Sequence, residues 1–287
     1  MSYIAVVTDS MANLPRELVE QYRIVVIPLL VAFGQEVFRD GVDMTPEEFY
    51  RRLRVERNSP TTSTPALGIF LELYRRLSLE AEGIVSIHLS EHLSATVEVA
   101  REASGMLPEV PIQVIDTHTA AMAQGFIVLE AAKVAAAGGG MEEVVARAEE
   151  MIPKAYLRAM VDTLEYLHRT GRIGRAESLF GSLIQIKPII HVASDGVVEA
   201  LERPRTRGKA LRRLVEMMAE QVGERSVHAA VMHADALEEA ESLCQRVADH
   251  FHCMELFLTH FTPVMGTHAG PGVVGVAFWA EGQGEQQ

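Results

Sequence analysis

Hydrophobic segments of strand length alternate with amphipathic segments of helical period through the first half of the chain. The predicted strands cover 3–10, 23–33, 83–90 and 111–117. Each of them is a short apolar run bounded by polar or turn-forming residues. The predicted helices cover 15–22, 45–54, 66–77, the segment ending at about Met106, and 119–137. A hydroxyl-rich loop is predicted at 59–65. This alternation is typical of a parallel sheet with helices on both faces.

The second half of the chain has a different order of elements. A helix predicted at 141–155 follows three glycines, and the segment 158–164 is predicted to be extended. Two strands are predicted within 186–205, joined by a hairpin turn at Asp195-Gly196. The later elements are a helix at 207–222, a strand at 226–235, a helix at 236–249, a strand at 254–260 and a last strand after Gly275.

A division into two domains agrees with the length of the chain, because 287 residues are many for a single core. The N-terminal domain is expected over 1–155, with a parallel sheet flanked by helices. The C-terminal α/β domain is expected over 156–287, with a mixed sheet. The predicted fold class is therefore α/β.

Polar residues collect where the predicted strands of the first half end. They are Thr8, Asp9, Ser10, Ser90, Asp116 and Thr117, together with the loop 61–64 and the segment 92–96. Ligands of open parallel sheets bind outside the carboxyl ends of the strands. Each residue also has a structural explanation, because Ser, Thr and Asp commonly cap a following helix or hold a turn. Only their clustering favours a binding site.

The composition of the chain mainly excludes classes of function and location. A net charge of −13 argues against a nucleic acid partner, because phosphate binding needs a basic face. No apolar run reaches the length of about 18 residues that a membrane span needs. The two cysteines, Cys244 and Cys253, form no CxxC motif and are interpreted as reduced thiols. We therefore expect a cytoplasmic protein.

The sequence contains no complete motif for nucleotide binding, nucleophilic catalysis or metal binding. The stretch Gly270–Gly275 fits G-x-G-x-x-G, but only twelve residues follow it, too few for the helix that a dinucleotide site requires. We interpret these glycines as a bent loop that enters the last strand and carries His268. The sequence contains no P-loop and no G-x-S-x-G elbow. Its histidine pairs lack a third ligand, so no metal site is expected.

One charge run stands out in this acidic chain. It consists of Arg203, Arg205, Arg207, Lys209, Arg212 and Arg213. Two interpretations stay open: a solvated helix face, or a docking patch for an acidic partner.

Seven segments in order along the chain resemble one known family. They are VVTDS (6–10), TTSTPA (61–66), HLSAT (92–96), VIDTHTAAMAQG (114–125), DTLEYLHRTGRIG (162–174), IQIKPII (184–190) and GTHAGPGVVG (266–275). Together they resemble the DegV family, the bacterial fatty-acid-binding proteins that serve as the lipid-carrying subunit of fatty acid kinase. The resemblance covers essentially the whole length. Three positions depart from the family pattern, at Ala66, Ala95 and Ala269.

The resemblance implies a two-domain α/β protein with a fatty acid bound between and within its domains. The carboxylate would be held by Thr62, Ser94 and His268. The residues expected near the head group are Ser63, Ala95, Thr96, Arg172, Gly266 and Gly270. The resemblance implies no cofactor and no metal beyond the lipid ligand.

The resemblance also implies a role without catalysis by this chain. The protein would present the carboxylate to a separate ATP-dependent kinase, and the acyl phosphate would feed phospholipid synthesis. We expect the kinase to dock through Arg203, Arg205, Arg207 and Lys209, and the protein to contact a membrane surface transiently.

Elementary energetics supports a lipid ligand. Each buried CH₂ contributes about 0.8 kcal/mol, so about 14 methylenes offer on the order of 11 kcal/mol before ordering costs. The candidate tail walls are the helices at 66–77 and 119–137, although most of their apolar residues are expected to be ordinary core. A protonated His268 would balance the charge of the carboxylate. Two alternatives stay open: a Ser/His acyl-ester hydrolase, with Ser63 or Ser94 as nucleophile and His268 as base, and a small-molecule-binding regulator.

Overall fold

A parallel sheet forms the first half of the fold in the computed structural model, which describes residues 3–56, 59–181 and 186–282. Its strand order is β2-β1-β6-β7, and all neighbours pair in parallel. The strands are β1 (Ile4–Asp9), β2 (Val25–Ile27), β6 (Gly83–His88) and β7 (Ile112–Asp116). The predicted α/β class with an N-terminal parallel sheet is therefore confirmed.

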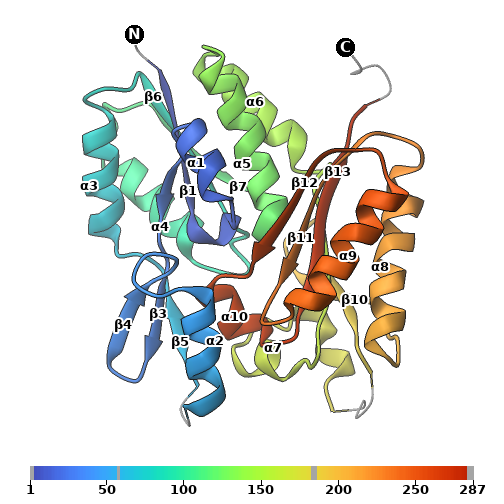
Figure 1. The fold of residues 1–287 in the computed structure, drawn as a ribbon. Helices are drawn as coiled ribbons and strands as arrows, with labels where there is room; N and C mark the ends of the chain where they lie inside the picture. The colour runs from blue at the N-terminus through green and yellow to red at the C-terminus, as the bar shows by residue number, and fades with distance from the viewer. Residues whose placement is uncertain (1–2, 57–58, 182–185, 283–287) are drawn as a thin grey trace.

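Helices cover both faces of this sheet (Figure 1). They are α1 (Arg16–Gln21), α3 (Leu67–Leu77), α4 (Thr96–Gly105), α5 (Ala121–Ala136) and α6 (Met141–Met151). Alternate side chains of β1 separate the two faces: Ala5 and Val7 pack with α3 and α4, whereas Ile4 and Val6 pack with α5 and α6. This period of two is what a strand buried on both sides requires.

The second sheet is mixed and has the order β10-β9-β8-β13-β11-β12. Its strands are β8 (Tyr156–Met160), β9 (Ile189–Val192), β10 (Val198–Glu202), β11 (Val227–His233), β12 (Cys253–His260) and β13 (Val274–Ala280). Only β11 and β12 pair in parallel among these neighbours. Helices α8 (Arg207–Val222) and α9 (Leu237–His250) pack on one face.

The other face of the second sheet turns toward α5. Buried residues of α5, such as Phe126, share one core with Val6 of the first sheet and Ala277 of the second. Every residue from Ala121 to Ala132 is buried, which explains why this helix is apolar on all sides. Helix α5 therefore lies between the two sheets, and one continuous core joins the two halves.

A small antiparallel sheet, β4-β3-β5, corrects two predictions. Its strands are β3 (Leu30–Phe33), β4 (Glu36–Arg39) and β5 (Thr61–Ser63), and helix α2 (Pro46–Val55) lies beside it. The predicted strand 23–33 is wrong as a single element, because Pro28 lacks an N–H for a ladder and separates β2 from β3. The predicted loop 59–65 contains β5, which forms because β3 offers it a partner.

The segment around His268 also differs from its prediction. Residues 263–269 form the short helix α10 (Pro263–Ala269), so His268 lies in a last helical turn and not on a loop. Thr262 caps this helix by accepting from Met265 N, and Pro263 occupies its first turn. The helix α7 (Glu165–Arg169) and the 3₁₀ helix η2 (Gly174–Leu179) follow β8.

The hairpin turn at Asp195-Gly196 is confirmed, with β9 and β10 antiparallel and Gly196 at φ +83°. Residues 184–185 of the IQIKPII segment lie outside the described residues. Within the described ranges, no helix is both long and apolar enough to cross a membrane.

Two helix glycines are predicted to respond to alanine in opposite directions. A Cβ on Gly125 of α5 would lie 2.5 Å from the carbonyl oxygen of Ala12, whereas a Cβ on Gly68 of α3 meets nothing within 4 Å. Gly125→Ala should therefore lower the free energy of unfolding by about 1–3 kcal/mol. Gly68→Ala should raise it by up to about 1 kcal/mol. Urea unfolding measures both, and a stabilising Gly125→Ala would contradict the close packing of α5.

Candidate functional site

A cavity of about 330 Å³ lies where the two halves of the chain meet. This volume falls within the range of about 300–1,000 Å³ that is typical of ligand pockets. Most of its walls are aliphatic. The apolar lining from the second sheet consists of Leu157, Ala159, Val161, Ile190, Val192 and Val198. The remaining apolar lining includes Met11, Leu29, Leu89, Leu93, Phe261 and Val264.

The three residues predicted to hold a carboxylate all line this one cavity. Thr62 comes from β5, Ser94 from the loop between β6 and α4, and His268 from α10. Thr62 Oγ1 lies 2.9 Å from His268 Nε2, although the residues are 206 positions apart. The structure thus brings the three side chains to the same space, and their role as carboxylate ligands stays a prediction.

Of the residues expected near the head group, Ser63, Ala95 and Arg172 line the cavity. Thr96 does not, but its Oγ1 lies 2.8 Å from Ser94 Oγ and it begins α4. Ser94 Oγ also accepts from the backbone N–H of Thr96, at 3.4 Å. Ser94 is therefore held by the first residue of a helix.

The two glycines of the predicted set shape the backbone around α10 and do not line the cavity. A Cβ on Gly266 would lie 2.6 Å from the hydroxyl of Tyr50 and 2.7 Å from the ring of Phe49, so only glycine lets α10 approach α2 this closely. Gly270 has φ +78°, and a Cβ there would lie 2.3 Å from the ring of Tyr166. Both glycines fix the path of the helix that carries His268.

Arg172 brings a positive charge to the polar part of the cavity. Its Nε donates to the carbonyl of Leu93 at 3.1 Å, and its Nη1 donates to the carbonyl of Thr170 at 2.6 Å. Among the described residues no partner is recorded for Nη2. The guanidinium therefore keeps donor capacity beside the cavity while two carbonyls hold it in place.

The imidazole of His268 is neutral at pH 7 in this cavity. Burial lowers the pKa of His268 to about 4, and the charge of Arg172 lowers it further in the same direction. The expectation that a protonated His268 balances a bound carboxylate concerns the ligand-bound state and stays a prediction. Within the described part of the chain, Nδ1 of this buried ring has no hydrogen-bond partner.

The helices at 66–77 and 119–137, the candidate tail walls, contribute little to this cavity. No residue of 66–77 lines it in the described structure, and from 119–137 only Ala120 does. Helices α3 and α5 are packed into the cores on either side of the first sheet, as expected for most of their residues. Part of the cavity wall comes instead from alternate residues, which are Leu157 and Ala159 of β8 and Val161 just after it. That period of two was the available signal.

Part of the basic run is engaged in ion pairs. Arg207 forms ion pairs with Glu239 and Asp162, the latter at 2.7 Å. Arg213 pairs with Glu202 at 2.8 Å and Glu220 at 2.6 Å. Arg203, Lys209 and Arg212 line a separate surface depression, away from the cavity. The run is therefore partly an ion-pair network of α8 and its neighbours.

Asp116 holds a turn, as one of its two interpretations predicted. Its carboxylate accepts from His118 N at 2.8 Å and from Glu91 N at 3.2 Å. Among the residues that the structure describes, no three or more His, Cys, Asp or Glu side chains are placed to hold a metal ion.

Comparisons with known proteins agree on one family. The sequence model of a family described as "Uncharacterised protein, DegV family" matches residues 3–281. A DegV domain-containing protein of Streptomyces coelicolor is 40% identical over 276 residues, which are 96% of this chain and 97% of that protein.

Two solved structures share the fold over nearly the whole chain. A DegV family protein from Thermus thermophilus, described by its fatty acid binding, has a TM-score of 0.91 at 32% identity, covering 97% of this chain and 100% of that chain. DegV from Bacillus subtilis, described as a fatty acid binding protein, has a TM-score of 0.90 at 35% identity, covering 98% and 100%.

The ligand-free protein is predicted to lose stability on mild acidification because of His268. Its folded pKa of about 4 lies below the 6.5 of an ordinary histidine, so between these values the unfolded chain binds a proton that the folded chain does not. The contribution present above about pH 6.5 should fall by on the order of 2 kcal/mol at pH 5. Urea unfolding of wild type and His268→Gln should therefore show a stability difference that shrinks from pH 7 to pH 5. A difference independent of pH would contradict the neutral imidazole.

Proposed function

The chain belongs to the DegV family, and on that basis we propose that it binds a long-chain fatty acid in the cavity. The observation that carries the proposal is the composition of this cavity. Its walls are aliphatic over most of their extent, and a threonine, a serine, a histidine and an arginine converge on it. Two structural relatives described as fatty-acid-binding proteins support the same ligand class.

The tail would supply most of the binding free energy. Transfer of methylenes from water into an aliphatic cavity contributes about 0.8 kcal/mol for each CH₂. The strands β8, β9 and β10 contribute mainly apolar residues to the cavity, and the polar exception is His191 of β9, whose Nε2 lies 3.4 Å from Glu199 Oε2. A largely apolar wall suits an alkyl chain, since it presents few polar groups that the chain would leave unpaired.

The head group would be held by neutral donors and one fixed cation. The hydroxyls of Thr62 and Ser94 and the imidazole of His268 can each donate to a carboxylate oxygen. Arg172 offsets the negative charge, which a neutral His268 leaves unbalanced. Binding of a carboxylate beside the ring would in turn favour protonation of His268.

We further propose that the chain acts as a carrier for a separate ATP-dependent kinase. It would present the carboxylate for acyl-phosphate formation, and the product would feed phospholipid synthesis through transient contact with a membrane surface in the cytoplasm. Arg203, Arg205 and Lys209 are the proposed docking residues, because Arg207 is already paired with Glu239 and Asp162. We also propose that the boundary near residue 155 separates two domains, with the lipid between and within them.

The hydrolase alternative is weaker on geometry. A general base near Ser63 or Ser94 needs an orienting partner and a pKa near neutral. His268 has a pKa lowered to about 4, and its Nε2 contacts Thr62 instead of a serine. Ser94 Oγ contacts Thr96. No specific observation favours the regulator alternative.

Loss of the Thr62 hydroxyl is predicted to weaken fatty acid binding about 10- to 100-fold, because a hydrogen bond to a charged group contributes about 1.5–3 kcal/mol. Thr62→Val is compared with Thr61→Val, which makes the same change one residue earlier on β5, where the side chain does not line the cavity. Titration with a fluorescent fatty acid measures both dissociation constants. Equal affinities for the two variants would contradict the proposed head-group site.

Native mass spectrometry of the purified wild-type protein tests the ligand class directly. We expect a long-chain fatty acid bound under native conditions and released on denaturation. Covalent labelling by a fluorophosphonate, or turnover of a chromogenic acyl ester that Ser94→Ala abolishes, would instead support the hydrolase.

Charge reversal at the proposed docking residues is predicted to separate kinase coupling from lipid binding. Arg203→Glu with Lys209→Glu should raise the concentration of carrier that half-saturates the kinase about tenfold or more, since the like charges of an acidic docking face then repel. The control is Arg75→Glu with Arg76→Glu, the same charge change on α3. Fatty acid affinity should stay at the wild-type value in both. A parallel loss of lipid binding would overturn the docking assignment.

A further inference from the structure

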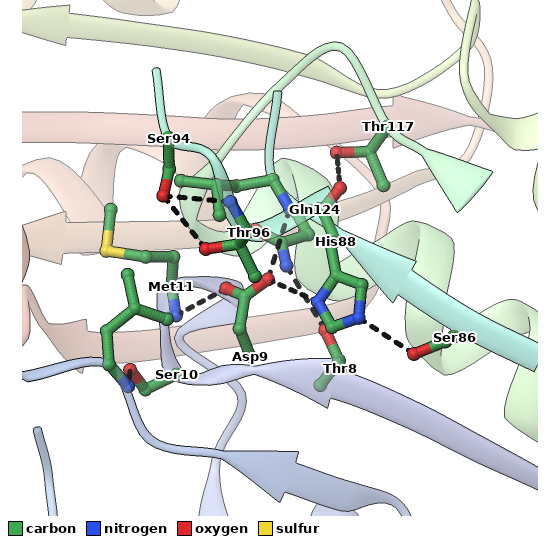
Figure 2. A network of polar contacts seen from close by, with 12 residues as sticks. Thr8, Asp9, Ser10, Met11, Ser86, His88, Ser94, Thr96, Thr117 and Gln124 are labelled. Atoms are coloured by element: carbon green, nitrogen blue, oxygen red, sulfur yellow. Dashed lines mark hydrogen bonds and ion pairs between the residues drawn. The ribbon is translucent and has the colours of Figure 1, made fainter. Parts of the chain in front are cut away.

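Asp9 is a fully buried carboxylate at the end of β1 with an unusual set of partners. Its Oδ1 accepts from the backbone N–H of Met11 at 3.0 Å. Its Oδ2 accepts from the backbone N–H of Leu89 at 3.2 Å and lies 2.8 Å from His88 Nδ1 (Figure 2). One side chain thus joins its own strand end to the end of β6.

The contacts of His88 continue away from Asp9. His88 Nε2 lies 2.8 Å from Ser86 Oγ, and the hydroxyl of Tyr74 donates to the same Ser86 oxygen at 2.8 Å. The arrangement that uses every hydroxyl proton has Ser86 donating to Nε2 and the proton of the imidazole on Nδ1, donated to Asp9. Asp9 is then an acceptor with three donors, so both of its buried oxygens have hydrogen-bond partners.

Serine, histidine and aspartate in this order resemble a hydrolytic triad, but the chain of contacts has no access to a substrate. Ser86, His88 and Asp9 are all 0% exposed. None of the three lines the cavity of the candidate site. Their chemistry is therefore confined to holding the backbone.

The backbone that they hold forms the wall of the cavity. Met11 and Leu89, whose N–H groups bond to Asp9, both line it. Ser10, the next residue, accepts from the backbone N–H of Leu29 at 3.1 Å, and Leu29 also lines it. Two consecutive side chains therefore fix three separate segments, and each of these segments contributes an apolar residue to the same wall.

Leu89 also begins the loop that carries part of the head-group site. This loop, residues 89–95, includes Leu93, Ser94 and Ala95 of the cavity lining. Displacement of its first N–H would shift the residues that follow. Ser90 Oγ donates to the carbonyl of Gly196 at 2.9 Å and ties the loop to the β9–β10 turn, so movement at Leu89 would reach the opposite wall as well.

We propose that Asp9 and Ser10 are positioning residues of the lipid cavity, which fix the walls through Met11, Leu89 and Leu29 and do not contact the ligand. This inference rests on the proposed fatty acid function. It assigns the pair a role in affinity beyond their role in folding.

The test is Asp9→Asn, which keeps the size of the side chain. It replaces one carboxylate oxygen, a hydrogen-bond acceptor, with an NH₂ group that faces an N–H donor. We expect the dissociation constant for a fluorescent fatty acid to rise about tenfold, which corresponds to about 1.4 kcal/mol. The matched control is Glu130→Gln, the same change at another buried carboxylate, which pairs with Lys133 and Arg147 of α5 and α6 and does not line the cavity. It should lower the Tm and leave the affinity unchanged.

Wild-type fatty acid affinity of Asp9→Asn, measured below its Tm, would overturn the proposal. The proposal would also be overturned if Glu130→Gln lost as much affinity as Asp9→Asn at an equal decrease in Tm. If Asp9→Asn does not fold, Ser10→Ala decides in its place, because it removes the acceptor of Leu29 N and leaves the contacts of Asp9 in place; it also removes the Ser10 hydroxyl that bonds to Asp40. A weakened affinity supports the proposal and an unchanged one overturns it.

A ligand-independent measurement separates this proposal from the function on which it rests. Nitrogen-15 NMR should show His88 of the wild-type protein with its proton on Nδ1. Amide exchange at Met11 and Leu89 should be slow and should accelerate in Asp9→Asn. Wild type that binds no fatty acid would remove the proposed function even if these signatures are present. A His88 proton on Nε2, or exchange at both amides unchanged in the variant, would overturn the positioning role itself.

Discussion

The hydrogen bond between Thr62 and His268 joins two residues that lie 206 positions apart, and the polar part of the cavity depends on it. Thr62 is on β5, an edge strand of the small sheet, and His268 is in the last turn of the seven-residue helix α10. Neither element is long enough to be stable alone. Each is fixed by long-range contacts: β5 by β3, and α10 by the close approach that Gly266 allows against α2.

The electrostatics of the cavity depends on the burial of His268 and on the charge of Arg172. Burial lowers the pKa of His268, so the positive charge at the polar part of the cavity comes from Arg172. Under the proposed function, the site would carry one positive charge before a fatty acid carboxylate binds and would be balanced afterwards. By contrast, the buried carboxyl group of Asp9 has three hydrogen-bond donors within the protein itself, so its contacts are independent of Arg172.

Local sequence patterns predicted the elements whose neighbours do not alter them. Helix α8 was predicted at 207–222, the bounds it has, because an amphipathic face and the Thr206 cap decide it locally. The strand 23–33 was wrong because its halves join different sheets on either side of Pro28. The helix around His268 was missed because its glycines read as a loop, whereas Thr262 and Pro263 start a helix.

The candidate site divides in the same way. The polar site residues were predicted from the family motifs, which specify individual positions, and the structure brings Thr62, Ser94 and His268 to one cavity. No motif specified the residues of the tail walls. Their prediction on 66–77 and 119–137 used the most apolar helices, and those are the segments that a protein packs most completely. The cavity lies instead beside strands, because their backbone hydrogen bonds to neighbouring strands keep them from moving into the empty space.

An apolar cavity in a folded protein is a cost that packing would otherwise remove, because its lining lacks contacts on one side. It persists only if the surrounding backbone is tied so that side chains cannot move in to fill it. Three kinds of tie meet at this cavity: the ladders of β8 to β10, the close contact of α10 with α2, and the buried acceptors at the end of β1. The first two hold whole elements. The third holds Met11, Leu29 and Leu89, which lie outside the strands and have no ladder of their own, so side-chain acceptors supply the hydrogen bonds that a ladder would give.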